Sequence, residues 1–338
     1  MSVLITGGAG YIGSHMVWEC IDHNDDVVVL DNLVTGFEWA VAPQATFVRG
    51  DVADDVLVHS IIKDHKVDAI VHFAGSVVVP ESLENPLKYY DNNTGKTRAL
   101  VESAVACGVD QFIFSSTAAV YSPPETLDPV DENGPLGPLS PYGNSKLMSE
   151  TMIRDVATAH GLRYVMLRYF NVAGADPKRR TGLSTKGATH VIKLACEAAT
   201  GKRPWFEVYG TDYNTHDGSA VRDFIHVADL ANAHYVALKF LRDGGRKFTA
   251  NAGYTKGASV LEVVEAVKRI SGNDFEVRMM PRRAGDIPAI VADASRLQSR
   301  LNWKPRYNDL DQIIADALAW EDTLTVRRAQ DAMATSDS

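Results

Sequence analysis

Short apolar runs alternate with segments of helical periodicity through the first half of the chain. The apolar runs, which predict buried strands, are residues 2–5, 27–30, 46–49, 69–73, 111–114 and 163–168. Helix-like spacing of apolar side chains covers residues 11–21, 56–63 and 86–107, and a further helix is expected to begin near Tyr142. Strands that alternate with helices predict an α/β fold with a doubly wound parallel (Rossmann) sheet.

A glycine turn follows the first predicted strand and opens the first predicted helix. Gly7, Gly10 and Gly13 match a G-x-x-G-x-x-G pattern, and Gly8, Gly10 and Gly13 match G-x-G-x-x-G. Glycine permits a tight turn and close approach of the backbone, and the free N–H groups at the start of a helix can bind a pyrophosphate. Strand, glycine turn and helix together predict a dinucleotide site.

Acidic residues end the second and third predicted strands. Asp31 lies about 20 positions after the glycine turn, where a carboxylate accepts hydrogen bonds from the adenosine ribose. Such a carboxylate also repels a 2′-phosphate, which favours NAD over NADP. Asp51 and Val52 would border the adenine, although a turn is an equally good interpretation of Asp51 alone.

The carboxyl ends of the next two strands carry small and hydroxylated residues. Ala74 and Gly75 would let a ligand approach the backbone, and Ser116 and Thr117 would face the ligand crevice of an open sheet. His72 lies inside an apolar strand with no His or Cys at ligand spacing. We therefore expect a hydrogen-bonded core histidine and no metal site.

Composition narrows the class of protein. The net charge of -9 and the pI near 5.6 argue against a general nucleic-acid or membrane-surface binder. The three widely spaced cysteines, Cys20, Cys107 and Cys196, fit reduced thiols better than disulfides. No apolar run approaches the ~18 residues of a membrane span. The first residues predict a buried strand and not a signal peptide, so we expect a cytoplasmic protein.

Tyr142 and Lys146 lie four residues apart and share one face if their segment is helical. A phenol has a pKa near ~10, and a neighbouring ammonium lowers it. Such a pair can take a proton from an alcohol near neutral pH. Because the same spacing is common at the start of an ordinary amphipathic helix, the catalytic interpretation depends on the sites for cofactor and substrate.

Four motifs together resemble the extended short-chain dehydrogenase/reductase family. They are the glycine turn, the Ser116-Thr117 strand end, the Tyr142/Lys146 pair and the segment at residues 168–171. Residues 91–93, 218–227 and 282–288 resemble in particular the members that epimerise UDP-glucose and UDP-galactose at C4. The resemblance runs from Met1 to about Glu321.

The resemblance implies a mechanism. Tyr142 would remove the proton of the sugar 4-hydroxyl, Lys146 would lower its pKa and bind the nicotinamide ribose, and Thr117 would bind the 4-oxygen. The C4 hydride would pass to tightly held NAD, and the 4-keto ring would turn over. The hydride would then return to the other face, so that no net redox change occurs.

The resemblance also implies the binding residues. The cofactor set is Gly7, Gly10, Tyr11, Ile12, Gly13, Asp31, Asn32, Asp51, Val52, Phe73, Ala74, Gly75, Asn92, Tyr142, Lys146 and Phe170. The UDP-sugar set is Thr117, Tyr142, Asn171, His190, Tyr209, Arg222, Arg283, Asp286 and Ile290. In it, Asn171, Arg222 and Arg283 would bind the phosphates. Asp286 would bind the ribose, and Tyr209 would lie beside the uracil. Guanidinium groups suit phosphate oxygens on chemical grounds alone, although surface ion pairing is their more usual role.

Strict alternation of strands and helices ends near residue 175. Helical periodicity continues over residues 185–200, 227–241 and 260–270. We expect an NAD-binding Rossmann domain at residues 1–174, with part of residues 218–250 packing back on it. A smaller, discontinuous α/β substrate domain would span residues 175–325, and residues 326–338 would be a frayed tail. The resemblance implies a homodimer joined through the helices that begin near Pro86 and Tyr142.

Three positions depart from the family pattern. Val77 replaces a lysine near the cofactor, so we expect the glycine turn and Asp31 to retain NAD(H). His190 lies where paired asparagines are usual, and it could bind a sugar hydroxyl or cap a helix. Ile290 replaces a bulky aromatic residue and would leave room for a 2-acetamido group.

Other activities remain open to different degrees. The sequence discriminates poorly against C4 epimerases of UDP-N-acetylglucosamine, UDP-xylose or UDP-glucuronate, and it does not distinguish galactose breakdown from polysaccharide supply. A nucleotide-sugar dehydratase needs a carboxylic acid beside the strand-end threonine, where this chain has Ala118 and Ala119. A reductase would consume its cofactor, and a non-catalytic sensor would have no use for a base.

Overall fold

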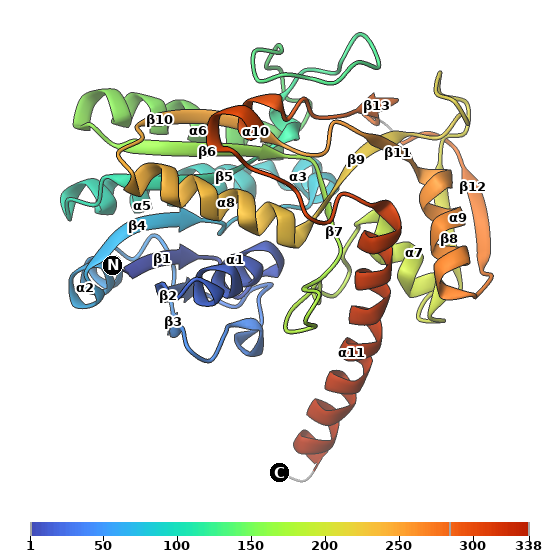
Figure 1. Cartoon of the computed structure of the whole chain (residues 1–338), viewed down its shortest axis with the longest axis horizontal. Coiled ribbons are helices and arrows are strands. Elements are labelled where there is room, and N and C mark those ends of the chain that lie inside the picture. Colours follow the sequence, from blue (N-terminus) through green and yellow to red (C-terminus); the bar gives the residue numbers. More distant parts are fainter. Residues whose placement is uncertain (1, 284, 337–338) are drawn as a thin grey trace.

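Seven parallel strands form the central sheet of the computed structural model, which describes residues 2–283 and 285–336 (Figure 1). They are β1 (Ser2–Thr6), β2 (Asp26–Asp31), β3 (Thr46–Arg49), β4 (Val67–His72), β5 (Gln111–Thr117), β6 (Arg163–Tyr169) and β10 (Lys247–Ala252). Their order is β10-β6-β5-β4-β1-β2-β3. The chain reverses direction across the sheet between β1 and β4, and ligands bind at the strand ends beside such a switch point. The predicted doubly wound sheet is confirmed.

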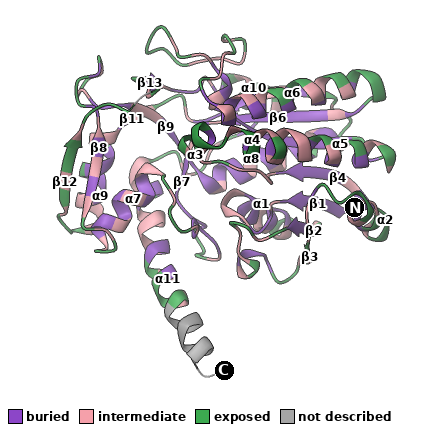
Figure 2. Cartoon of the chain, turned by 180° about the vertical axis from the view of Figure 1, so that it is seen from behind, coloured by how far each residue is buried: buried purple, intermediate pink, exposed green. Residues whose placement is uncertain are grey.

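Helices cover both faces of this sheet. The helices α1 (Tyr11–Asp22) and α8 (Val227–Arg242) pack together on one face, where they bury Val3 and Ile5 of β1. On the other face α2 (Asp55–His65), α5 (Lys96–Ala106) and α6 (Pro141–His160) enclose a second core that includes Leu4 and Phe112. Alternate residues of each strand thus enter opposite cores. The central strands are accordingly buried (Figure 2).

The remaining elements form a smaller layer beside the carboxyl ends of the central strands. One of its sheets contains β7 (Asn171–Ala173), β9 (Val221–His226), β11 (Gly257–Ser259) and β13 (Ala289–Ile290), and another pairs β8 (Trp205–Tyr209) with β12 (Glu276–Met280). The helices α7 (Val191–Ala199), α9 (Val260–Ser271) and α11 (Leu310–Ser336) share a third core, whereas α10 (Ser295–Leu301) contacts β10.

Two of the predicted helices differ from the structure. The segment predicted as one helix at residues 86–107 is α4 (Pro86–Tyr89), a π-helical turn (Tyr90–Gly95) and α5, preceded by a short α3 (Val79–Glu84). The helix predicted from residue 185 begins at Val191, because Gly187 has a φ of +71° and His190 is extended. The tail also differs, since α11 continues to Ser336 where fraying was expected from residue 326.

Across residues 2–283 and 285–336, none of the helices combines the length and apolar character needed to cross a membrane.

Candidate active site

The glycine turn between β1 and α1 is packed too tightly for larger residues. Gly7 has a φ of +71°, and a Cβ added there would lie 2.6 Å from the Ala74 nitrogen. A Cβ on Gly13 would lie 2.1 Å from the Gly7 carbonyl oxygen. Gly10 precedes α1 and has no side chain to cap it, which leaves the first helical N–H groups for an anion. This close backbone cradle fits the pyrophosphate of the NAD that the sequence predicts.

The Asp31 carboxylate is held at the end of β2 by main-chain hydrogen bonds. Its Oδ2 accepts from the Ala9 N–H at 3.0 Å, and its Oδ1 accepts from the Leu33 N–H at 2.8 Å. Burial raises the pKa of Asp31, and these two hydrogen bonds oppose that rise. The carboxylate therefore lies beside the glycine turn, at the position where an adenosine ribose is expected.

The residues predicted to lie beside the adenine, Asp51 and Val52, follow β3, and polar side chains surround Asp51. The Asn32 side chain donates to Asp51 Oδ2 at 3.5 Å, and Lys96 donates to the same oxygen at 2.6 Å. Burial acts to raise the pKa of Asp51. Hydrogen bonds, chiefly the one from Lys96, outweigh burial and hold this pKa below its usual range. Val52, the next residue in the chain, is buried.

Asn93 connects the end of β4 to α6, a role that the sequence did not reveal. Its Oδ1 accepts from the Ser76 N–H at 2.7 Å, and its Nδ2 donates to Ser145 Oγ at 3.0 Å. A Cβ on Gly75 would lie 2.9 Å from Asn93 Oδ1. The predicted cofactor residue Asn92 instead donates to Ser76 Oγ at 3.0 Å. The π-helical turn places the buried Asn93 side chain, and not that of Asn92, against Gly75.

Three predicted cofactor residues lie in apolar clusters. Ile12 packs against the core between the sheet and α1. The ring of Phe73 lies 4.7 Å from that of His234, measured between centroids. Phe170 is buried in a small cluster with Ala118, directly after the strand end that carries the predicted threonine.

The first turn of α6 is fixed against the chain that follows β5. Ser140 Oγ caps the helix by accepting from the Gly143 N–H at 3.2 Å. A Cβ on Gly143 would lie 2.3 Å from the Ala119 carbonyl oxygen, so only glycine allows this approach. The helix therefore presents Tyr142 and Lys146, both buried, at the end of β5.

Thr117, Tyr142 and Lys146 meet at that strand end. Burial raises the pKa of Tyr142, and hydrogen bonding with Thr117 acts in the opposite direction. Burial lowers the pKa of Lys146 to about 8, against the attraction of Glu150. Lys146 Nζ donates to the Ser115 carbonyl oxygen at 3.0 Å. Burial outweighs hydrogen bonding at the phenol, and a lowering of its pKa by Lys146 stays a prediction.

A second cluster brings together four of the predicted substrate residues. Arg283 Nε donates to Asp286 Oδ2 at 3.0 Å, and the Arg283 guanidinium lies over the Tyr209 ring at 4.5 Å from its centroid. Burial lowers the pKa of Arg222, and the nearby Asp286 and Tyr213 oppose this. Tyr213 was not predicted from the sequence. Two guanidinium groups beside one carboxylate suit a ligand with phosphate and hydroxyl groups.

Strand pairing connects this arginine cluster to the catalytic residues. Ile290 of β13 is paired with Arg222 of β9, and its side chain packs in the cluster that contains Ala118. Asn171 begins β7, which also pairs with β9. Ile290 therefore lies between the arginines and the strand end that carries Thr117.

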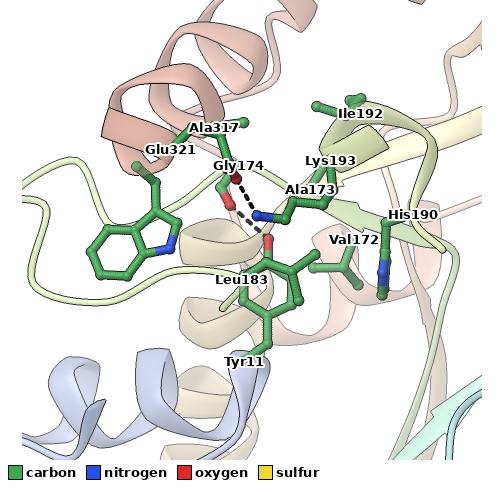
Figure 3. A pocket seen from close by; sticks show the side chains of 11 residues that line it. Tyr11, Val172, Ala173, Gly174, Leu183, His190, Ile192, Lys193, Ala317 and Glu321 are labelled. Atoms are coloured by element: carbon green, nitrogen blue, oxygen red, sulfur yellow. Dashed lines mark hydrogen bonds and ion pairs between the residues drawn. The ribbon is translucent and has the colours of Figure 1, made fainter. Parts of the chain in front are cut away.

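His190 lies beside Tyr11 at the edge of a small cavity of about 20 Å³ (Figure 3). Their ring centroids are 6.3 Å apart, and the Tyr11 hydroxyl donates to the Gly174 carbonyl oxygen at 2.7 Å. His190 does not cap α7 through its side chain, and its Nδ1 has no hydrogen-bond partner among the described residues. His190 occupies the N-cap position of α7 through its backbone alone, and its contact with a sugar hydroxyl stays a prediction. Behind it, Lys193 is ion-paired with Glu321 of α11.

Comparisons with known proteins agree with this geometry. Residues 3–253 match the model of the NAD dependent epimerase/dehydratase family. A UDP-glucose 4-epimerase of Azospirillum brasilense is 49% identical over 322 residues, which cover 95% of this chain and 92% of the relative. The crystal structure of UDP-glucose 4-epimerase from Brucella ovis in complex with NAD has a TM-score of 0.91 and 42% identity, covering 94% of this chain and 97% of that one. The UDP-Glc/GlcNAc 4-epimerase of Campylobacter jejuni has a TM-score of 0.84 and 45% identity, covering 95% and 99%.

Proposed function

Because the chain belongs to the NAD dependent epimerase/dehydratase family, we propose that its candidate site epimerises UDP-glucose and UDP-galactose at C4. The observation that carries this proposal is the meeting of Thr117, Tyr142 and Lys146 at the end of β5, between the glycine turn and the arginine cluster. The test is to incubate the purified protein with UDP-galactose, without added cofactor, and to follow UDP-glucose by NMR. A protein that leaves UDP-galactose unchanged would refute the proposal.

The chain's own residues account for binding and proton transfer. When bound, NAD supplies a hydride acceptor for C4 and a positive charge that favours the Tyr142 phenolate. Tyr142 takes the proton of the 4-hydroxyl and later returns it, while Thr117 holds the 4-oxygen. Arg222 and Arg283 hold the diphosphate, so that the 4-keto ring turns over without leaving the site. His190 lies beside Tyr11 of the cofactor set, and we propose that it binds a sugar hydroxyl.

A dehydratase is a poorer match to the same site. That reaction requires a carboxylic acid next to the strand-end threonine in order to move a second proton. Ala118 and Ala119 follow Thr117, and their methyl groups cannot transfer protons. The Ala119 N–H donates to Thr117 Oγ1 at 3.1 Å, which fixes the threonine without introducing an acid.

The position of Ile290 supports a second substrate, UDP-N-acetylglucosamine. Its side chain lies between the arginine cluster and Ala118, where the hexose is expected. We expect the protein to epimerise this sugar, and we expect Ile290→Tyr to lower kcat/KM for it by about 5- to 150-fold, since overpacking costs about 1–3 kcal/mol. The measurement is kcat/KM for the acetylated sugar and for UDP-galactose.

The matched control for this change is Ile290→Leu, which keeps the side-chain volume. That variant should turn over both sugars at rates close to those of the unchanged protein. Absence of any turnover of UDP-N-acetylglucosamine by the unchanged protein would reject the second substrate.

A homodimer through α4 and α6 is supported by exposed apolar side chains on that face. Leu87 of α4 is 77% exposed and Met148 of α6 is 51% exposed, and contiguous exposed apolar surface commonly marks an interface. We expect Leu87→Glu to convert dimer to monomer in sedimentation analysis. The control Val56→Glu, on α2 with 76% exposure, should leave the dimer intact. This proposal would be contradicted if the protein without substitutions sedimented as a monomer.

The remaining assignments follow from the same reaction. We assign NAD binding to residues 1–174 with α8 and β10, and UDP-sugar binding mainly to residues 175–325. The free thiols of Cys20, Cys107 and Cys196 support a reducing, cytoplasmic location. The reaction would serve the breakdown of galactose or the supply of UDP-galactose for polysaccharide.

A further inference from the structure

Glu150 lies on α6 one turn beyond Lys146, and its side chain is wholly buried. Arg168 of β6 donates to both of its carboxylate oxygens, from Nε to Oε1 at 2.9 Å and from Nη2 to Oε2 at 2.6 Å. Arg154 also donates to Oε2, at 2.7 Å. A buried ion pair contributes little net stability compared with apolar residues of similar volume. Its presence next to the reacting groups therefore points to a role beyond stability.

The Glu150 carboxylate also contacts β5, next to the residue of β5 that Lys146 contacts. Lys146 Nζ donates to the Ser115 carbonyl oxygen at 3.0 Å, and Ser116 Oγ donates to Glu150 Oε1 at 2.6 Å. The next residue of β5 is Thr117. These two contacts fix the strand end that carries Thr117 relative to the helix that carries the base.

Glu150 is also the source of negative charge near Lys146. The titratable groups around Lys146 are His72 from β4, Tyr142 and Glu150 from α6, and Tyr169 from β6, whose hydroxyl accepts from Ser115 Oγ at 2.8 Å. Burial lowers the pKa of Lys146 to about 8, and Glu150 opposes that effect. Among the described groups that face Lys146, the carboxylate of Glu150 is the one that favours its charged form.

We propose, on the basis of the epimerase function above, that Glu150 is a positioning residue that holds Thr117 opposite Tyr142 and keeps Lys146 charged. Arg168 supports Glu150 by fixing both carboxylate oxygens. Loss of the negative charge would remove the group that favours the charged form of Lys146. Lys146 would then lose its proton at a lower pH, and with it the charge that assists the base.

The test is the pH profile of kcat for the NAD-bound protein with UDP-galactose. Glu150→Gln keeps the shape of the side chain and removes its charge. We expect the alkaline limb to move down by about one pH unit, which corresponds to about an eightfold loss at pH 8.5 and less than a twofold loss at pH 6.5.

The double variant Glu150→Gln/Arg168→Met separates this role from a loss of stability. It also removes the buried guanidinium that Glu150→Gln alone would leave without its carboxylate, so stability should recover, whereas the alkaline limb should stay shifted because the carboxylate is still absent. The control Glu102→Gln, at an exposed acid of α5, should keep the unchanged profile. An unshifted alkaline limb in the double variant would overturn the inference. An unchanged protein without C4 epimerase activity would instead overturn the proposed function.

Discussion

Tyr142→Phe should lower turnover of UDP-galactose by about 10³-fold, because proton transfer by a positioned side chain typically contributes 10²–10⁴-fold. The phenol is buried at the end of β5, where Thr117 is its hydrogen-bonding neighbour. Phenylalanine keeps the ring, so the fold and bound NAD should be retained. The measurement is kcat by NMR or a coupled assay, together with the NAD content of the purified variant.

Tyr164→Phe is the matched control for this prediction. Tyr164 of β6 has the same 7% exposure as Tyr142 but lies in the core on the face covered by α2, α5 and α6. We expect its removal to leave kcat within about twofold, as for most substitutions away from a site's chemistry. Full activity in Tyr142→Phe would overturn the assignment of the base.

Acid should destabilise the protein through three buried neutral histidines. Burial is the main cause that lowers the pKa of His72 to about 3, and of His15 and His234 to about 4. His72 is hydrogen-bonded to Thr6 and Thr97, which confirms a satisfied core histidine. Nε2 of His15 and of His234 is buried without a hydrogen-bond partner among the described residues. A proton there would be a buried, unpaired charge.

The lowered pKa values of these histidines determine how the free energy of unfolding changes with pH. Well above pH 6.5 both the folded and the unfolded histidines are neutral, and the stability is fully present. As the pH falls toward 4, the unfolded histidines gain protons that the folded ones do not. Each lowers the free energy of unfolding by about 1.2 kcal/mol between pH 7 and 5.5. Burial raises the pKa of Asp223 to about 6, so this group acts in the opposite direction. It adds about 0.8 kcal/mol to the free energy of unfolding over the same pH range.

The expected net loss is about 3 kcal/mol between pH 7 and pH 5.5, measured by urea unfolding at fixed NAD concentration. His234→Asn should remove about one third of the histidine contribution to the pH dependence. An unfolding free energy that is the same at both pH values would contradict the assignment of these histidines as neutral core residues.

The regular part of the fold was predictable because local patterns agree with tertiary packing. The glycine turn at Gly7 and the strand ending at Asp31 combine strict spacing with an unambiguous apolar pattern. The structure places both as predicted. The strand β10 escaped prediction because its partner, β6, lies about 80 residues earlier in the chain. Such pairing leaves no local signal.

Three features of the site could not be predicted, for different physical reasons. Apolar periodicity at residues 86–107 does not reveal the π-helical turn, because one extra residue per turn changes which face Asn92 and Asn93 occupy. The direction of the pKa shift of Tyr142 depends on complete burial, which spacing alone cannot give. The roles of Glu150 and Arg168 depend on a contact between a helix and a strand that are distant in the sequence.

During turnover the sugar should be oxidised and reduced again at C4 without exchange of its hydrogen with solvent. UDP-galactose that carries deuterium at C4 tests it most directly, with purified protein, ordinary water and no added NAD. The expected product is UDP-glucose that retains the deuterium at C4, observed by NMR and mass spectrometry. Product with hydrogen from water at C4, or a need for added NAD at the level of the substrate, would contradict it.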